Sequence, residues 1–368
     1  MRVILAAGGS GGHIFPSLAL EAEIQKKGDH DVFFVSSMRR LDRTLLDKNE
    51  KEAFFLSVNP MPRKFNPVKI FTFICNLIKD VFRSFAILLK VKPHVVVGFG
   101  GYSSGAICMS ARILNVPVLI HEQNLYPGRA NKILKFFVNK IAVSFKDSFS
   151  FFKHYRHKLI YSGNPIRLGS LNNEPRASAV RLDLDSDKLT VLIMGGSQGS
   201  SFLNKSLSKV AKLIKEQKGE TIQFIHLTGK KDFKDIECFY KNNMISGRVF
   251  PFLDRIDDAY ALCDIAVTRA GASAIFELAY YGKPMILIPY PNPKNNQRFN
   301  AVYFSEQGAA INEREKGLEA ETLFREIMEI LEGKEKYCEM AENAARLGFP
   351  DAGKVLAEEV LALGAKRR

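Results

Sequence analysis

The sequence offers little cysteine chemistry and no long apolar run. Its five cysteines are scattered, with no C-x-x-C pair and no zinc-site spacing, which argues against a disulfide or metal framework and suits a reducing compartment. No stretch of about 18 uncharged apolar residues occurs, so we expect no membrane-spanning helix. The first residues, MRVILAAGG, run from a predicted strand into a glycine loop, so we also expect no signal peptide and a cytosolic protein.

Acidic residues are scarce in one window of the chain. Residues 63–158 contain sixteen Lys and Arg but three Asp and Glu, a balance of +13, whereas residues 1–62 carry eight of each and residues 159–368 carry 29 against 28. The window therefore holds nearly all of the net charge of +14. This concentration of positive charge indicates either a nucleic-acid binder or a surface for anionic lipid.

The chain also lacks the standard nucleotide-binding loops. A predicted strand at 3–6 leads into GGSGGH (8–13) and a helix from about Pro16, but the loop has neither G-x-G-x-x-G spacing nor a GK[ST] ending. The strand at 32–35 ends without an acidic residue for a cofactor ribose, so a dinucleotide is not expected. His13 at the end of the loop is either a candidate general base or a capping or core-edge histidine.

Glycine or polar loops follow most of the predicted strands. Residues 95–97 lead into GFGGYSSG, residues 118–120 lead into HEQN, and another strand is expected at 141–144. The pattern restarts with a strand at 191–194 and the loop GGSQGS, followed by strands at 224–227, 249–251, 265–268 and 285–288. The length of 368 residues suits two such domains. We therefore predict an α/β fold of two facing Rossmann-like domains, with ligands in a cleft between them.

The stretch from 267 to 300, VTRAGASAIFELAYYGKPMILIPYPNPKNNQRFN, predicts half of a nucleotide-sugar site. It reads as a strand, a glycine turn and a helix that ends near Tyr281, with Gly282 as the helix-ending residue. Unpaired N–H groups at the start of this helix favour a phosphate, and Glu277 offers a carboxylate to two adjacent sugar hydroxyls. A purely structural strand–glycine–helix unit is the alternative.

Two further segments allow two interpretations each. Residues 65–90 predict a helix with an unusually wide apolar face, which indicates either burial between neighbours or contact with a membrane. Its polar face is predicted to comprise Lys69, Thr72, Asn76, Lys79, Asp80 and Arg83. The run Asp183-x-Asp185-x-Asp187 is interpreted as a solvated loop rather than a cation site, because it lacks the Gly and distal Glu of a calcium loop.

Seven motifs occur in one order over about residues 1–305: GGSGGH, GFGGYSSG, HEQN-x-x-PG, GNPIR, GGSQGS, RAGASAIFE and NNQRFNA. Each is weak alone, but the ordered set closely resembles the MurG family of bacterial peptidoglycan N-acetylglucosaminyltransferases. The resemblance implies the GT-B fold and transfer of N-acetylglucosamine from UDP-GlcNAc to lipid I, giving lipid II. Lipid I is undecaprenyl-pyrophosphoryl-MurNAc-pentapeptide, and the 4-hydroxyl of its MurNAc is the acceptor. We expect an inverting displacement that needs no metal ion or other cofactor, in cell-wall biogenesis that supports cell shape and division.

The resemblance also implies roles for individual residues. Three residues of the first loop would lie beside the donor–acceptor cleft, namely Ser10, Gly11 and Gly12. Asn124 would contact the donor, Arg167 and Ser197 would hold its diphosphate, and Leu253 would present its backbone to the uracil. The diphosphate and ribose would bind Ala272, Ser273, Ala274, Ile275, Phe276 and Glu277, and the sugar would bind Gln297. His13 is the candidate general base and Glu122 the alternative. The sequence departs from the usual family pattern at Ser10, Ala106, Ala270 and Asn296.

The expected domains are residues 1–164, joined by a C-terminal helix at about 350–368, for acceptor and membrane, and residues 165–349 for UDP-GlcNAc. Expected partners are UDP-GlcNAc, lipid I, the anionic inner membrane surface and other cell-wall synthesis proteins, with no nucleic acid. The predicted location is peripheral, on the cytoplasmic face of the bacterial inner membrane. Contact with acyl chains is expected from Ile70, Phe71, Phe73, Ile74, Leu77, Phe82 and Phe85, ringed by Arg63, Lys64, Lys69, Lys79 and Arg83. A nucleotide-sugar 2-epimerase and a noncatalytic membrane-surface scaffold are the alternative functions.

Overall fold

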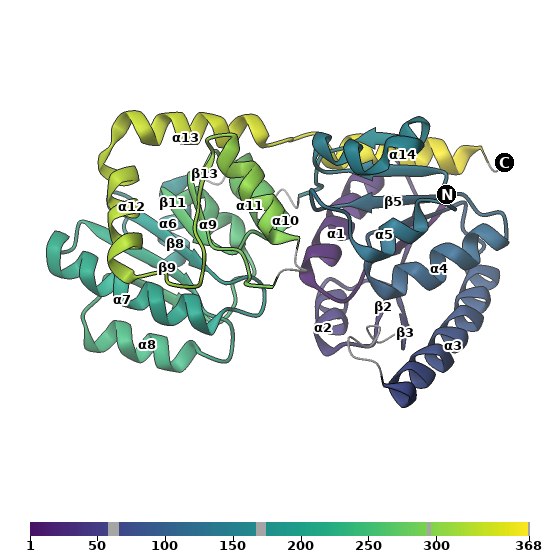
Figure 1. The fold of residues 1–368 in the computed structure, drawn as a ribbon, viewed down its shortest axis with the longest axis horizontal. Coiled ribbons are helices and arrows are strands. Elements are labelled where there is room, and N and C mark those ends of the chain that lie inside the picture. Colours follow the sequence, from purple (N-terminus) through teal and green to yellow (C-terminus); the bar gives the residue numbers. More distant parts are fainter. Residues whose placement is uncertain (58–65, 167–173, 293–295, 367–368) are drawn as a thin grey trace. The chain divides into compact units, whose positions relative to one another are not determined.

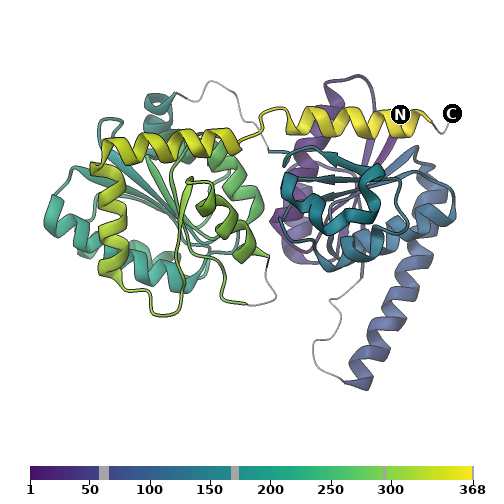
Figure 2. The same cartoon turned by 45° about the horizontal axis from the view of Figure 1, so that its top comes forward.

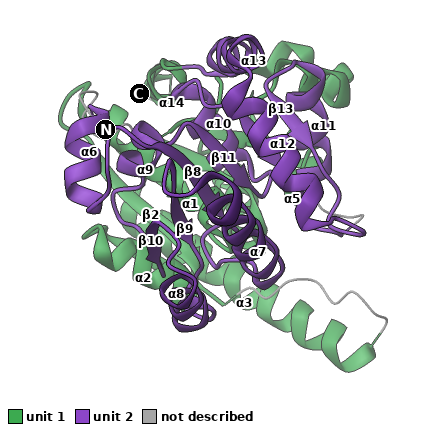
Figure 3. Cartoon of the chain, turned by 90° about the vertical axis from the view of Figure 1, so that its left-hand side faces the viewer, with its two compact units in different colours: residues 1–167, 350–368 green, residues 168–349 purple. Residues whose placement is uncertain are grey.

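The computed structural model describes residues 1–57, 66–166, 174–292 and 296–366. The chain divides into two compact units, unit 1 (Met1–Arg167 and Pro350–Arg368) and unit 2 (Leu168–Phe349), which are coloured separately in Figure 3. Each unit has its own parallel sheet and its own core.

Unit 1, the part of the chain that carries the N and C labels in Figure 1, is built on a seven-stranded parallel sheet in the order β3-β2-β1-β4-β5-β6-β7. The strands are β1 (Arg2–Ala6), β2 (Asp31–Ser37), β3 (Ala53–Leu56), β4 (Val95–Gly98), β5 (Val118–Glu122), β6 (Lys140–Val143) and β7 (Leu159–Tyr161). The helices are α1 (Gly11–Gln25), α2 (Arg40–Lys48), α3 (Pro67–Val91), α4 (Gly101–Ile113), α5 (Arg129–Leu134), the 3₁₀ segment η1 (Lys146–Lys158) and α14 (Ala352–Ala365). Because the strand order reverses between β1 and β4, the loops after these two strands meet at the edge where such sheets bind ligands.

Unit 2 repeats this plan with a six-stranded parallel sheet in the order β10-β9-β8-β11-β12-β13. The strands are β8 (Leu189–Met194), β9 (Ile222–Leu227), β10 (Gly247–Phe250), β11 (Ile265–Thr268), β12 (Met285–Leu287) and β13 (Ala310–Asn312). The helices are α6 (Pro175–Leu182), α7 (Ser201–Lys218), α8 (Phe233–Asn242), α9 (Ile256–Leu262), α10 (Ala272–Tyr280), α11 (Gln297–Glu306), α12 (Ala320–Glu332) and α13 (Lys334–Leu347). Here the order reverses between β8 and β11, so the loops after those strands are neighbours.

Most strand residues are apolar and buried because helices cover both faces of each sheet. In β1, Ile4 belongs to the core on one face, whereas Val3 and Leu5 belong to the core on the other. All three side chains are fully buried. Continuous apolar strands of this kind are typical of parallel sheets, in which successive side chains point to opposite faces.

The C-terminal helix α14 lies in unit 1, where it packs against α1 and β4. Leu356 and Val360 join the core formed by Val3 and Leu5. Gly353 lies so close to α1 that an added Cβ would come within 2.8 Å of the Glu23 side chain. Figures 1 and 2 show α14 lying along unit 1 after the chain has completed unit 2.

The elements differ from the sequence predictions at several points. Helix α1 begins at Gly11 rather than near Pro16, because the carbonyl of Ser10 already accepts bonds from the N–H groups of His13 and Ile14 at 3.2 and 3.4 Å. Pro16 therefore lies inside the helix. Elements that the sequence did not predict include α2, β3, η1, β7 and β13. These elements are short, polar or broken, and η1 is interrupted by non-helical backbone at Phe152 and Tyr155.

The buried residues of helix α3 all lie in its C-terminal half. Ile87, Leu88 and Val91 join the core, whereas the N-terminal part extends beyond the rest of unit 1 (Figure 2). The polar face was wrongly predicted at Asp80, which is fully buried; a hydrogen bond of 2.9 Å from the N–H of Ser57 satisfies its carboxylate there. The basic positions Arg63 and Lys64 lie outside the described residues.

Candidate functional site

The glycine loop after β1 is held by a buried carboxylate. Oδ2 of Asp42 on α2 accepts bonds from the N–H of Gly9 at 2.7 Å and from the hydroxyl of Ser37. A Cβ on Gly8 would lie 2.9 Å from both the Ser36 hydroxyl and the Ser37 N–H, so the loop needs glycine there. Asp42 is fully buried and thus fixes the path of residues 8–13.

The loop after β4 packs directly on this glycine loop. Gly101 has a φ of +82°, and an added Cβ would lie 2.7 Å from the carbonyl oxygen of Gly8. A side chain at this position is therefore excluded both by backbone conformation and by space. Gly100 approaches His13 in the same way, with its Cβ position 3.1 Å from Cε1 of the imidazole. The loops GGSGGH and GFGGYSSG therefore lie together between β1 and β4, where the strand order of the unit 1 sheet reverses.

His13 lies at the start of α1 and is partly buried. Its Nδ1 is 3.0 Å from Oε1 of Gln123, which follows β5. Burial lowers the pKa of His13, and this effect is partly offset by the bond to Gln123, the charges of Glu122 and Asp42, and the carbonyl of Phe99. A neutral imidazole at the ligand-binding edge of a sheet is suited to accepting a proton.

Glu122 is placed differently from His13. Its carboxylate is 2% exposed and accepts four bonds. The donors are the backbone N–H and side chain of Asn124 at 3.0 and 3.2 Å, the N–H of Gly128 at 2.8 Å, and the side chain of Asn131 at 2.8 Å. These bonds tie together the loop that carries HEQN. The two hydrogen bonds from Asn124 to Glu122 thereby fix the orientation of Asn124.

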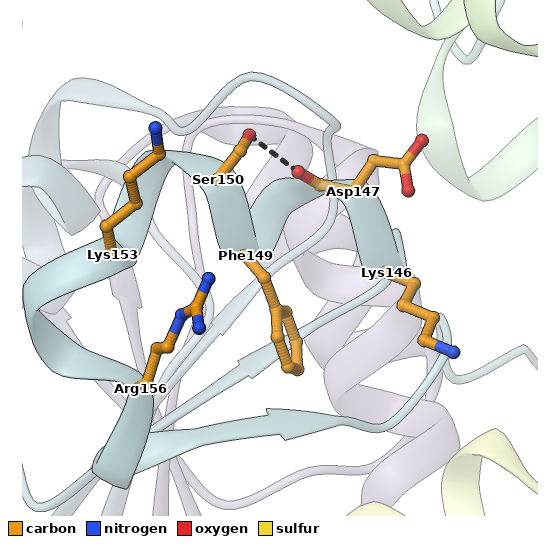
Figure 4. Close-up of a pocket in the computed structure, with 6 residues that line it drawn as sticks. All are labelled: Lys146, Asp147, Phe149, Ser150, Lys153 and Arg156. Atoms are coloured by element: carbon orange, nitrogen blue, oxygen red, sulfur yellow. Dashed lines mark hydrogen bonds between the residues drawn. The ribbon is translucent and has the colours of Figure 1, made fainter.

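The segment η1 forms an open basic basin near the end of β6 (Figure 4). The basin has a volume of about 480 Å³ and is lined by Lys146, Asp147, Phe149, Ser150, Lys153 and Arg156. Ser150 donates to the carbonyl of Asp147 at 2.8 Å, which holds the turn. Three cationic side chains against one carboxylate suit the basin to an anionic group.

In unit 2, the loop GGSQGS packs against the turn after β9. An added Cβ on Gly199, whose φ is +76°, would come within 1.9 Å of the carbonyl oxygen of Thr228. Ser200 caps α7 by accepting a bond from the N–H of Leu203 at 3.4 Å. Ser197, the predicted diphosphate contact, is exposed on this loop.

Arg269 joins the loops that end four of the strands in unit 2. Its guanidinium donates to the hydroxyl of Ser200 at 2.7 Å and to the carbonyl of Ile288 at 3.1 Å. It also pairs with Glu315 at 2.6 Å and lies over the ring of Tyr290. Arg269 is buried, and its contacts fix the positions of the loops that follow β8, β11, β12 and β13 relative to one another.

The first N–H groups of helix α10 lie at the edge of the unit 2 sheet where the loops after β8 and β11 are neighbours. Gly271 precedes the helix, and the first intrahelical bond runs from the N–H of Ile275 to the carbonyl of Gly271 at 3.1 Å. The N–H groups of Ala272, Ser273 and Ala274 thus belong to the first turn, where an anion is favoured. The side chains of Ile275 and Phe276 point into the core.

The remaining predicted donor residues of unit 2 lie around this helix. Glu277 is partly buried and accepts a bond of 2.7 Å from the phenol of Tyr260. Oε1 of Gln297 accepts a bond of 3.0 Å from the N–H of Tyr290, and its Nε2 lies 3.9 Å from the Cβ position of Gly271. Leu253 is partly buried in the loop after β10. Gly282, with a φ of +61°, follows the end of α10 as predicted.

Two sequence predictions lie elsewhere. Arg167 falls outside the described residues, so its proposed contact with the diphosphate has no structural description. The Asp183–Asp187 run precedes β8, at the opposite end of the strand from the glycine loop. Asp183 pairs with Arg248 there, and Asp185 accepts a bond from the N–H of Asp187 at 2.9 Å. Within residues 1–57, 66–166, 174–292 and 296–366, no cluster of three His, Cys, Asp or Glu side chains is placed to bind a metal ion.

Both units match known protein families. Residues 3–143 match the glycosyltransferase family 28 N-terminal domain, and residues 190–356 match the glycosyltransferase family 28 C-terminal domain. The chain belongs to glycosyltransferase family 28. A family 28 relative from Halothermothrix orenii is 33% identical over 364 residues, which cover 97% of each chain. It is named UDP-N-acetylglucosamine–N-acetylmuramyl-(pentapeptide) pyrophosphoryl-undecaprenol N-acetylglucosamine transferase.

Solved structures confirm the GT-B fold of two Rossmann-like domains. The crystal structure of Acinetobacter baumannii MurG has a TM-score of 0.74 at 23% identity and covers 98% of this chain and 100% of that one. A UDP-GlcNAc 2-epimerase from Neisseria meningitidis, bound to UDP-GlcNAc, has a TM-score of 0.67 at 18% identity, with coverage of 98% and 100%. Both structures share the fold, whereas the similarity in sequence over nearly the full length is to the transferases. The predicted resemblance to the MurG family is thus confirmed.

Three residues of the site were not predicted: Asp42, Arg269 and Gln123. Asp42 lies on a helix that was not predicted, and Arg269 was identified only as part of a motif. Gln123 was noted within HEQN but was given no role of its own. Each acts on a residue far away in the chain, and Gln123 and His13 are separated by 110 positions.

Proposed function

We infer that this protein transfers N-acetylglucosamine from UDP-GlcNAc to the 4-hydroxyl of MurNAc in lipid I and thereby makes lipid II. The observation that carries this conclusion is identity of about one third, over nearly the whole chain, to transferases named for this reaction. Both halves of the family fold are present, each with a glycine loop at the switch point of its sheet. The reaction inverts the anomeric centre, because one displacement converts an α-linked donor into a β-linked product.

Unit 2 binds the donor. The N–H groups of Ala272, Ser273 and Ala274, together with Ser197, stabilise the diphosphate as its charge grows in the transition state. Glu277 accepts hydrogen bonds from the ribose hydroxyls, Gln297 contacts the sugar, and the backbone of Leu253 contacts the uracil. On the basis of the sequence motifs, Arg167, Asn124, Ser10, Gly11 and Gly12 are also proposed to contact the donor.

Unit 1 supplies the general base and binds the acceptor. His13 takes the proton of the acceptor hydroxyl, since its imidazole is neutral at pH 7 and its environment lowers its pKa. Four hydrogen bonds already engage Glu122, so its role is to shape the loop. This arrangement favours His13 over Glu122 as the base. The basic basin on η1 is available to an anionic part of the acceptor.

The same unit binds the anionic inner membrane surface from its cytoplasmic face. Phe71, Ile74, Ile78 and Phe82 recur at helical spacing on α3, and all four side chains are exposed; we name them the α3 stripe. Lys69, Lys79 and Arg83 are exposed on the same helix. Ile70, Phe73, Leu77 and Phe85 are partly buried, so only part of the expected apolar set reaches solvent.

Neighbouring helices extend the apolar character of this region. Ile113 of α4 and Ile133 of α5 are exposed, as are Phe136 and Phe137 just after α5. Helix α4 packs against both α3 and α5, and Phe73 contacts Tyr102 across the first of these interfaces. No helix in the described part of the chain is long and apolar enough to span a bilayer. Apolar insertion and basic attraction together support attachment to the surface.

Incubation of the purified protein with UDP-GlcNAc and lipid I tests the proposed reaction. The expected product is a β-1,4-linked disaccharide on the lipid carrier, with one UDP released for each. A 2-epimerase would instead release UDP or the epimeric sugar nucleotide without a lipid acceptor, and a noncatalytic scaffold would consume neither substrate.

A further inference from the structure

A chain of hydrogen bonds connects His13 to the backbone of unit 1. Nδ1 of His13 is 3.0 Å from Oε1 of Gln123, and Nε2 of Gln123 is 3.0 Å from Nδ1 of His121. Nε2 of His121 is in turn 3.0 Å from the carbonyl oxygen of Gly163. His121 and Gln123 are buried, so water does not compete for these bonds.

The Gly163 carbonyl, at the end of this series of hydrogen bonds, determines which atom donates in each of them. A carbonyl oxygen can only accept, so Nε2 of His121 carries the proton. Nδ1 of a neutral His121 is then an acceptor, which requires the amide nitrogen of Gln123 to face it. A second bond of 3.0 Å, from this nitrogen to the carbonyl of His121, supports the same orientation. The amide oxygen therefore faces His13, whose Nδ1 must donate.

This order depends on a neutral His121. The pKa of His121 is lowered to about 4, mainly by burial; the bond to the Gly163 carbonyl opposes this effect, and the positive charge that His13 can carry adds to it. His121 is thus neutral near pH 7, and an arrangement in which both of its nitrogens donate is excluded. Its ring also packs 5.6 Å from that of Phe99, which restricts rotation.

We propose that Gln123 and His121 are positioning residues that hold His13 in the tautomer with the proton on Nδ1 and the lone pair on Nε2. This inference rests on the proposed role of His13 as general base. In the transfer, the acceptor oxygen bonds to the anomeric carbon while the bond between that carbon and the β-phosphate oxygen breaks. The electron pair leaves with UDP, and the acceptor proton moves to Nε2 of His13.

The neutral amide has a consequence for pH dependence. When Nε2 of His13 takes the proton, the imidazolium donates a stronger hydrogen bond through Nδ1 to Gln123. This series of hydrogen bonds contains no carboxylate that could stabilise the positive charge of the imidazolium. The other groups that act on His13 are Asp42, Glu122 and the carbonyl of Phe99. Activity as kcat/KM should therefore fall only below pH 6.5, the ordinary pKa of histidine.

The tautomer can be measured without any substrate. The full-length protein labelled with ¹⁵N-histidine gives two-bond ¹H–¹⁵N correlations that distinguish Nδ1–H from Nε2–H, and the His13→Gln variant identifies the signals of His13. We expect the Nδ1–H form in the unsubstituted protein and a shift towards Nε2–H in Gln123→Leu. His226, buried in unit 2 between Tyr240 and Asn204, is the matched control whose signals should not change.

Kinetics separate positioning from a merely structural role. Gln123→Leu should lower kcat about 10- to 100-fold with donor KM unchanged, which is the size typical of groups that orient a reacting side chain. Gln123→Glu keeps an acceptor for Nδ1 and adds a negative charge, so the acid limb of kcat/KM should move to higher pH. An Nε2–H tautomer in the unsubstituted protein, or an unmoved acid limb in Gln123→Glu, would overturn the inference. Lack of transferase activity in a protein with the Nδ1–H tautomer would instead overturn the proposed function.

Discussion

The phenol of Tyr260 donates a hydrogen bond of 2.7 Å to Oε2 of Glu277. Burial and the neighbouring Glu277 charge raise the pKa of Tyr260 well above its ordinary value, so the phenol remains a donor. One oxygen of Glu277 is thus held by a fully buried side chain. This contact fixes the carboxylate at the edge of unit 2 where the ribose is proposed to bind.

Removal of the Glu277 carboxylate should weaken donor binding. A hydrogen-bonded pair with one charged member contributes about 1.5–3 kcal/mol, so Glu277→Ala should raise the donor KM about 10- to 150-fold. Tyr260→Phe should raise it less and in the same direction, because the carboxylate remains but is no longer held. Initial rates over a range of UDP-GlcNAc concentrations give both values.

A deoxyribose analogue of the donor tests which part of UDP-GlcNAc contacts Glu277. The unsubstituted protein should discriminate between the ribose donor and the analogue, and Glu277→Ala should lose most of this discrimination. Equal discrimination by both proteins would place the ribose elsewhere.

His13 and Glu122 should respond differently to substitution. His13→Ala should lower kcat about 10²- to 10⁴-fold while donor affinity is retained, because only proton transfer is lost. Glu122→Gln should instead lower the melting temperature, since it removes a charged acceptor of four bonds. Parallel kinetic and thermal unfolding measurements compare the two. An inactive but stable Glu122→Gln beside an active His13→Ala would exchange the roles.

Much of the fold could be predicted from the sequence because strands buried on both faces are continuous apolar runs. The strands near residues 3–6, 95–97, 191–194 and 265–268 were identified for this reason. Helix α2 and strand β3 were missed because both are short: α2 is a mainly polar segment of nine residues, and β3 has only four residues. The start of α1 was misplaced because glycines and Pro16 are not typical of a helix interior.

The candidate site could be predicted only in part. Glycine loops and a helix N-terminus carry local signals, so GGSGGH, GGSQGS and residues 272–277 could be identified. The contacts of Asp42 with Gly9 and of Arg269 with Ser200 join residues 33 and 69 positions apart, and such pairs leave no local pattern. The burial of Asp80 was missed for the same reason, since its partner Ser57 precedes the helix.

Chelation should leave turnover largely intact. The diphosphate is proposed to be stabilised by the first N–H groups of α10, by Ser197 and by Arg167, which do not require a cation. Activity after EDTA treatment should therefore remain measurable, although added magnesium can increase it. Complete loss in EDTA that magnesium restores would show that a divalent cation is required.

The α3 stripe should bind anionic vesicles. Each basic residue near such a surface contributes about 1 kcal/mol, and each buried CH₂ group about 0.8 kcal/mol. Phe82 is 70% exposed, so Phe82→Glu should weaken binding without unfolding the protein, and Lys69→Glu should act likewise. Binding should also fall as salt concentration rises. Co-sedimentation with vesicles of defined charge measures these effects.

Val180 in unit 2 provides the matched control for the membrane prediction. It is 80% exposed on α6, so Val180→Glu introduces the same charge at a similarly exposed apolar position. This variant should bind vesicles as the unsubstituted protein does. Equal binding to neutral and anionic vesicles, or full retention by Phe82→Glu and Lys69→Glu, would place the attachment surface elsewhere.

The most direct test of the central claim is the release of UDP with and without lipid I. The protein should release UDP from UDP-GlcNAc at a rate that rises and saturates with lipid I, in step with formation of lipid II, and His13→Ala should lower the rate of both together. UDP release that is independent of lipid I, or conversion of UDP-GlcNAc to its epimer without an acceptor, would contradict the account.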